Sequence, residues 1–222
     1  QSMCEGAPEA FKTACTPSSA AQFLWSKDPK TWGEGFLSAY SPDQFALLEL
    51  FTPYATIWAP YYTLHKILAG LLDCYGLAGN QKARDIAEGI GTWVYRRLSA
   101  CAADQRAEMW SMYIAGEYGG FNESMASLYL LTGKQEYLTT ADMFYNPKLF
   151  DGLIWNHDTI TGLHANQHIP QIIGALETYA ATGDKKYFRM AKNFWNRVTG
   201  HYAYSIGGVG RGEMFKEPDI LA

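Results

Sequence analysis

The sequence lacks the features that mark nucleic-acid-binding and membrane proteins. Its 18 Lys and Arg residues are outnumbered by 22 Asp and Glu residues, and a net charge of −4 gives no support for binding to nucleic acid or to an anionic membrane. No apolar run approaches the roughly 18 residues that a transmembrane helix needs. No charged region followed by an apolar stretch marks a signal peptide within these residues. We therefore expect neither nucleic acid nor membrane as a partner.

The common metal and phosphate motifs are absent as well. Four cysteines are present, and no two of them have C-x-x-C spacing, which argues against a zinc knuckle or a thioredoxin-type motif: Cys4, Cys15, Cys74 and Cys101. Two disulfides are one interpretation, and buried free thiols are the one we favour in a chain of this size. Neither an H-E-x-x-H motif nor a G-x-x-x-x-G-K-S/T loop occurs. We predict no metal ligands in this chain.

What the chain has is apolar residues in helical spacing. Leu64, Leu68 and Leu71 lie on one face of a predicted amphipathic helix that ends at Gly79. A second helix, with its apolar stripe over residues 86–98, is predicted to follow.

This helix–glycine–helix unit recurs. Comparable turns occur at Gly133 and Gly183, so that the three turn glycines, beginning with Gly79, lie 54 and 50 residues apart. Helical hairpins repeated with this period predict an all-α fold, either an open solenoid or a closed toroid. Only residues 202–209 compete, as an edge strand or a hairpin.

Polar side chains gather near the first helix of each predicted hairpin. They are His65, then Glu117 with Asn122, then the stretch 164–168. A toroid would bring these groups together in a pocket, whereas a solenoid would spread them along a groove. Aromatic side chains flank the same positions and are candidates for stacking on sugars: Trp58, Tyr61, Tyr62, Trp110 and Tyr118.

The stretch 163–170 (LHANQHIP) concentrates two imidazoles and two carboxamides before Pro170. Because proline is tolerated in the first turn of a helix, we predict that this cluster lies at the N-terminus of a helix. The free N–H groups and the positive end of the helix dipole there favour oxygen-rich ligands. His164 and His168 are four residues apart and would suit a metal, but no carboxylate stands at a matching spacing. We favour hydrogen bonds to a polyhydroxyl ligand, with two structural histidines as the alternative.

Two glycine-rich stretches are chemically suggestive. Residues 116–120 (GEYGG) lead into a helix that Asn122 is placed to cap. Residues 207–215 (GGVGRGEMF) let the backbone approach a ligand closely and present Glu213 as a candidate general acid/base. The alternative for the second stretch is a surface turn with an ordinary glutamate.

Four stretches, in this order, resemble the β-L-arabinofuranosidase families of glycoside hydrolases: 56–67 (TIWAPYYTLHKI), 116–123 (GEYGGFNE), 163–170 (LHANQHIP) and 207–215 (GGVGRGEMF). The resemblance covers nearly everything from about residue 35 onward. It implies an (α/α)6 barrel that releases L-arabinofuranose, or a related sugar, from β-linked plant-type glycans with retention. It also implies a glutamate acid/base and a zinc-bound cysteine nucleophile, in place of the usual pair of carboxylates.

Carried over motif by motif, the resemblance implies that Glu213 is the acid/base and that His65 and His164 contact the sugar. It adds further candidates for the sugar pocket: Gln167, His168, Glu117 and Asn122.

The chain departs from the family at its ends. The Glu-Thr-Cys stretch that supplies zinc ligands and the later nucleophilic cysteine do not occur before Ala222, and the family's first helices do not precede Gln1. We therefore expect residues 1–222 to be an internal part of a single (α/α)6 catalytic domain, incomplete at both ends and inactive alone. Zinc is expected in the full-length enzyme, with none held by this chain.

The expected partner is an oligosaccharide or glycan, and a secreted or periplasmic location is favoured. Two alternatives stay open. One is another sugar enzyme on the same toroid, such as an epimerase or an unsaturated-uronide hydrolase. The other is a noncatalytic helical-repeat protein that binds carbohydrate.

Overall fold

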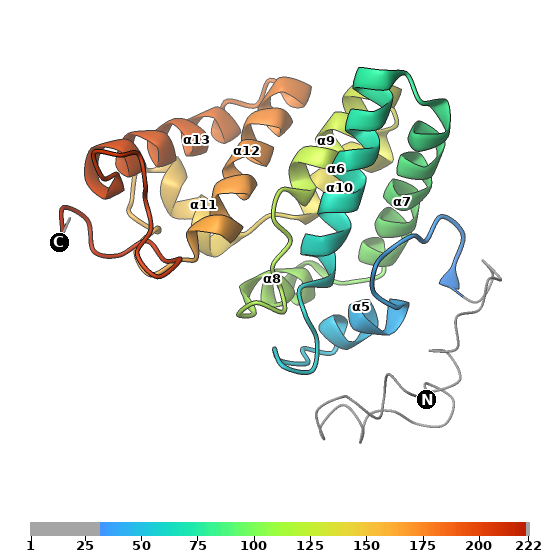
Figure 1. The fold of residues 1–222 in the computed structure, drawn as a ribbon, viewed down its shortest axis with the longest axis horizontal. Coiled ribbons are helices and arrows are strands. Elements are labelled where there is room, and N and C mark those ends of the chain that lie inside the picture. Colours follow the sequence, from blue (N-terminus) through green and yellow to red (C-terminus); the bar gives the residue numbers. More distant parts are fainter. Residues whose placement is uncertain (1–31, 221–222) are drawn as a thin grey trace. The chain divides into compact units, whose positions relative to one another are not determined.

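The structure, a computed structural model, describes residues 32–220, whose regular secondary structure is helical (Figure 1). They belong to two compact units, 32–117 and 118–220, which we describe separately. Over the described residues there are nine α-helices, a short π-helix and no β-strand. The prediction of an all-α fold is confirmed for this part of the chain. None of its helices is long and apolar enough to cross a membrane.

The first unit contains four helices: α5 (Pro42–Glu49), α6 (Pro60–Ala78), α7 (Gln81–Ser99) and α8 (Ala103–Ser111). Helices α6 and α7 form the predicted hairpin (Figure 1). Gly79 ends α6 with φ +64°, and its N–H donates to the Tyr75 carbonyl at 2.8 Å. Asn80 then begins α7, because its side chain accepts from the Ala83 N–H at 3.1 Å.

Aromatic rings in edge contact make up much of the core of the first unit. Phe45 packs edge-on against Tyr61 and Trp93, with ring centroids 4.9 and 5.1 Å apart. Tyr61 in turn meets Trp110 at 5.3 Å. Tyr61 and Trp110 are buried, so they are core residues and the suggestion that they stack on sugars was wrong.

The second unit contains α9 (Phe121–Thr132), α10 (Gln135–Met143), α11 (Pro147–Ile154), α12 (Ala165–Thr182), α13 (Lys185–Arg197) and the π-helix η1 (Val198–Tyr202). Gly133 and Gly183 end α9 and α12, each with φ +71°, and the hairpins α9–α10 and α12–α13 follow from these turns. Asp184 caps α13 by accepting from the Lys186 N–H at 2.9 Å. The three predicted glycine turns are therefore confirmed.

Helices α9 and α12 pack closely in the second unit. The buried Tyr118 hydroxyl lies just before α9 and donates to the Phe144 carbonyl at 2.8 Å, so Tyr118 is also a core residue. The Asn122 side chain fits against the bare Cα of Gly174 on α12. A separate apolar cluster joins α11, α12 and α13 and includes Phe194 and Phe215.

Two local predictions were wrong. Helix α12 begins at Ala165, so Pro170 lies inside it and not in its first turn. The first turn forms ahead of the proline because the Ala165 N–H already has a partner, the Glu213 carbonyl at 2.8 Å. Residues 202–209 make no strand: Tyr202 ends η1, and the Tyr204 N–H donates to the Gly208 carbonyl at 2.8 Å in a tight turn.

Of the cysteines, Cys74 is exposed and Cys101 is buried, and both thiols are free. Cys4 and Cys15 lie outside the described residues.

Candidate functional site

Glu213 lies at the tip of a tight turn made by residues 211–214. The Arg211 N–H donates to the Met214 carbonyl at 2.9 Å, and the Met214 N–H returns a weaker bond at 3.4 Å. Gly212 and Glu213 have φ of +58° and +67°, the pair of left-handed residues typical of a type I′ turn. This backbone is strained for glutamate, and it leaves the side chain 84% exposed. The turn therefore presents the carboxyl group outward on a constrained backbone.

Backbone hydrogen bonds fasten this turn to the start of α12. The Gly162 N–H donates to the Phe215 carbonyl, and the Phe215 N–H donates to the Leu163 carbonyl, both at 2.9 Å. The Ala165 N–H, one of the free donors at the start of α12, is taken by the Glu213 carbonyl at 2.8 Å. The N-terminus of α12 and the predicted glycine-rich loop are thus joined by backbone hydrogen bonds.

His164 is the N-cap residue of α12, and its Nε2 lies 4.0 Å from Glu213 Oε2. The contact becomes an ion pair when the imidazole is protonated. Two residues singled out in the sequence are therefore neighbours in space.

His168 lies one turn further along α12, with its Nδ1 2.8 Å from the His164 carbonyl oxygen. Since a carbonyl only accepts, Nδ1 carries the proton, and Nε2 is left as an acceptor in the neutral ring. Burial lowers the pKa of His168 to about 4, so the ring is neutral near pH 7.

Gln167 on α12 and Asn122 on α9, which packs against α12, are both buried. The Gln167 Oε1 atom is buried and has no hydrogen-bond partner within the described residues. Asn122 Nδ2 donates to the Gln171 carbonyl at 2.9 Å, which ties α9 to α12. Gly120, not Asn122, is the N-cap of α9, so the predicted cap was wrong. Asn122 lies too deep for capping because Gly174 lets its side chain enter the helix contact.

His65 and Glu117 belong to the first unit. His65 is buried in α6, and burial, with a smaller contribution from the Lys66 charge, lowers its pKa to about 4. Glu117 is half-buried at the end of a short loop, where its N–H donates to the Ile114 carbonyl at 3.0 Å. The convergence of these two residues with His164 and Glu213 stays a prediction.

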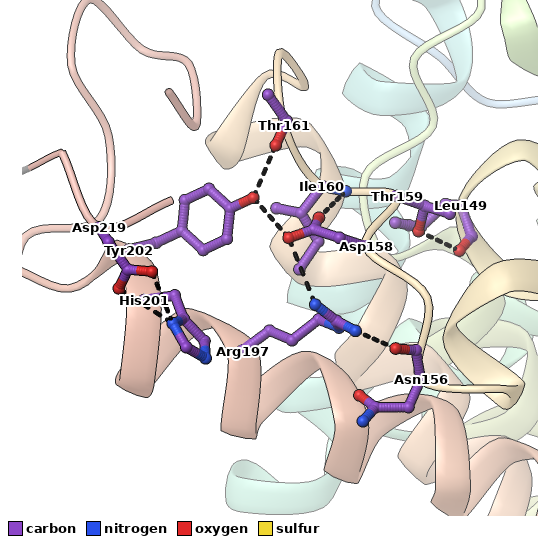
Figure 2. Close-up of polar contacts among 10 residues, drawn as sticks. All are labelled: Leu149, Asn156, Asp158, Thr159, Ile160, Thr161, Arg197, His201, Tyr202 and Asp219. Atoms are coloured by element: carbon purple, nitrogen blue, oxygen red, sulfur yellow. Dashed lines mark hydrogen bonds and ion pairs between the residues drawn. The ribbon is translucent and has the colours of Figure 1, made fainter. Parts of the chain in front are cut away.

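Residues 203–220 follow η1 and form the segment that carries Glu213. A polar network around Tyr202 holds the start of this segment (Figure 2). The Tyr202 hydroxyl donates to Asp158 Oδ2 at 2.8 Å, so Thr161 Oγ1, 2.7 Å away, donates to it in turn. Asp158 also pairs with Arg197 at 3.4 Å and accepts from the Ile160 N–H at 2.9 Å. Burial, together with the Asp158 carboxylate, raises the pKa of Tyr202 to about 12. The loop that precedes α12 is thereby joined to η1.

The far end of the same segment returns to η1. His201 Nδ1 lies 3.0 Å from Asp219 Oδ1, and the Asp219 N–H donates to the His201 carbonyl at 2.8 Å (Figure 2). Sequence reasoning missed this network, because its members look like ordinary surface polar residues until η1 places them. The signal for this network in the sequence was the pair His201 and Tyr202, which comes after the helix predicted to follow Gly183.

The described residues do not fit a metal centre. From residue 32 to residue 220 there is no group of three or more His, Cys, Asp and Glu side chains that could hold a metal ion. His164 and His168 do not make a ligand pair here, because the His168 Nδ1 is committed to a carbonyl and no third ligand accompanies them.

Comparison with known proteins agrees with the sequence motifs. Residues 20–222 match the profile of the family described as β-L-arabinofuranosidase, GH127 catalytic domain. No match was found among curated proteins. All four motifs that carried the resemblance fall inside the matched range. The match confirms the predicted family and implies a carbohydrate substrate, so this chain belongs to the GH127 β-L-arabinofuranosidase catalytic-domain family.

Proposed function

We propose that the protein is a retaining glycoside hydrolase that releases L-arabinofuranose, or a closely related sugar, from β-linked plant-type glycans. The observation that carries the proposal is the Glu213 carboxyl group, held outward on a strained turn and 4.0 Å from His164. Residues with strained backbone cluster at functional sites.

In the proposed reaction Glu213 is the general acid/base. Its carboxyl group protonates the glycosidic oxygen as the leaving group departs and a nucleophile from outside residues 32–220 bonds to the anomeric carbon. The resulting carboxylate then takes a proton from the water that displaces the sugar from that nucleophile. Exposure suits this role, because both the leaving group and the water must reach the carboxyl group.

His164, His168 and Gln167 are proposed to bind the sugar hydroxyls. The neutral His168 ring offers Nε2 as an acceptor, and the buried Gln167 Oε1 offers a second one. His164 is proposed to orient both the sugar and the Glu213 carboxyl group, and its Nε2, 4.0 Å from Glu213 Oε2, supports this role. The neutral His168 imidazole suits an uncharged sugar, because no ion has to be desolvated at that position on binding.

His65, Glu117 and Asn122 are proposed as further parts of the sugar pocket. We also propose that residues 1–222 are part of one (α/α)6 catalytic domain. The repeated hairpins α6–α7, α9–α10 and α12–α13 support that architecture.

The family resemblance implies zinc and a cysteine nucleophile. Because residues 32–220 offer no cluster able to hold a metal, we derive no step through zinc. We propose that zinc and the nucleophilic thiolate of the full-length enzyme are supplied from outside that range.

The test is Glu213→Gln in the full-length enzyme, with Glu217→Gln as the matched control. Glu217 is an exposed glutamate on the same segment. Glu213→Gln is expected to lower kcat by about 10²–10⁴-fold on a glycan, the usual contribution of a general acid/base, with sugar binding retained. Unchanged turnover in Glu213→Gln would overturn the proposal in favour of a noncatalytic carbohydrate-binding protein.

A further inference from the structure

Three aromatic side chains of the first unit are exposed and touch one another. Tyr54, Trp58 and Tyr113 are 37%, 53% and 71% exposed. The Tyr54 ring lies 5.1 Å from the Trp58 ring and 6.1 Å from the Tyr113 ring, centroid to centroid, in edge-on arrangements. We call these three side chains the aromatic platform.

Local structure holds Trp58 and Tyr54 in place. A bridge between Tyr54 and Ile57 closes the turn between them, and Ile57 is buried. The backbone N–H of Trp58 donates to Gln44 Oε1 at 3.0 Å, which holds the backbone that carries the indole. The indole itself is left facing solvent.

The backbone next to both tyrosines is strained. Ala55, directly after Tyr54, has φ +85°, and Ile114, directly after Tyr113, has φ +55°. Left-handed φ at non-glycine residues costs on the order of 1–3 kcal/mol each, and it is most unusual at a β-branched residue. Such strain persists at ligand-binding sites, where the surrounding structure holds it. Both strained positions of the platform lie beside an exposed ring, not beside a buried one.

The size of the platform favours a small ligand over a protein. A fully buried aromatic side chain covers about 150–250 Å², so the exposed fractions leave on the order of 350 Å² to be covered. A stable protein interface covers about 800 Å² on each partner. Flat rings with hydroxyl groups at their edges suit sugars, which pair apolar C–H faces with hydroxyl groups, and the family to which the chain belongs acts on carbohydrate.

We propose that the aromatic platform of Tyr54, Trp58 and Tyr113 is a carbohydrate-binding site that stacks on sugar units of the glycan other than the one released. The choice of glycan as the ligand rests on the proposed function. The site itself rests on the exposed, mutually packed rings and on the strained backbone that presents them.

The test uses Trp58→Ala in the full-length enzyme, with Trp195→Ala as the control, since Trp195 is 68% exposed on α13 and is not part of the platform. The probes are a linear arabinofuranosyl oligosaccharide and an aryl β-L-arabinofuranoside. Loss of one stacking contact worth about 1.4 kcal/mol is a tenfold effect. Trp58→Ala is therefore expected to raise the ratio of the two KM values, oligosaccharide over aryl glycoside, about tenfold with kcat unchanged. Tyr113→Phe, which keeps the ring and removes only the hydroxyl group, is expected to change this ratio less than Trp58→Ala does.

Direct binding separates this inference from the proposed function. The dissociation constant of the oligosaccharide is measured calorimetrically with Glu213→Gln and with Glu213→Gln/Trp58→Ala, so that turnover plays no part. Equal dissociation constants for the two variants would overturn the proposed binding site, whatever the role of Glu213. Tenfold weaker binding by Glu213→Gln/Trp58→Ala than by Glu213→Gln supports the site even if Glu213 proves noncatalytic. A Trp58→Ala protein that changes its oligomeric mass, with glycan affinity unaltered, would identify a protein-binding surface and also overturn the proposal.

Discussion

Replacing Gly174 by alanine tests the contact that joins α9 to α12. A Cβ atom at Gly174 would lie 2.1 Å from Asn122 Oδ1 and 2.4 Å from Asn122 Nδ2. Asn122 is buried and has no simple way to move aside, because its Nδ2 donates to the Gln171 carbonyl at 2.9 Å. The added methyl group must therefore push the two helices apart and, in doing so, break that hydrogen bond.

The expected loss of stability follows from three contributions. Forcing a methyl group into a packed contact costs about 1–3 kcal/mol. Leaving the buried Asn122 Nδ2 group without its acceptor, the Gln171 carbonyl, costs about 1–3 kcal/mol more. Alanine is better than glycine in a helix by about 1 kcal/mol, which offsets part of the loss. The free energy of unfolding should fall by on the order of 3 kcal/mol.

Urea unfolding followed by far-UV circular dichroism measures this change. Gly70→Ala in α6 is the matched control, because a Cβ there meets nothing within 4 Å and alanine should stabilise that helix. In an Asn122→Ala background the clash is absent, so adding Gly174→Ala should cost little or even stabilise. If Gly174→Ala behaves like Gly70→Ala, or if its cost is the same with and without the Asn122 side chain, the reasoning about this contact is refuted.

Three further predictions follow from the site. Burial lowers the pKa of His65 and of His168 to about 4 from an ordinary 6.5, so the unfolded chain takes up protons first on acidification. The stability that these neutral rings contribute is complete above pH 6.5 and is lost as the pH falls from 6.5 to about 4. His168→Gln should therefore reduce the change of the urea midpoint with pH across that range. A dependence of the midpoint on pH equal to that of the wild type would contradict the assignment. Tyr202→Phe, which strips the hydroxyl from the network around η1, should cost about 1–3 kcal/mol in thermal unfolding, and a loss no larger than that of Tyr204→Phe would argue against the network. His164→Ala should weaken sugar binding and turnover in the full-length enzyme with unchanged helical content, whereas a collapse of thermal stability would show that His164 is structural.

The candidate site was only partly visible in the sequence. The residue types and motif positions of His164 and Glu213 were enough to single them out, because imidazole and carboxyl groups in glycine-rich or helix-start surroundings are chemically conspicuous. Their contact was not visible, since it depends on hydrogen bonds between backbone groups of residues 162–165 and 213–215, which no local pattern encodes. Asn122 shows the opposite case: its type suggested a cap or a sugar contact, and its packing against Gly174 is visible only in the structure.

The sequence by itself determined the helical hairpins of this protein and the family to which it belongs. Helical periodicity and the glycines at 79, 133 and 183 act within one or two turns of chain, so they can be read without knowing the rest of the fold. Tertiary structure decided which aromatic rings are core and which face solvent, where α12 begins relative to Pro170, and how η1 secures the segment that carries Glu213. These features depend on contacts between residues distant in the chain, and burial and long-range hydrogen bonding settle them only once the helices have packed.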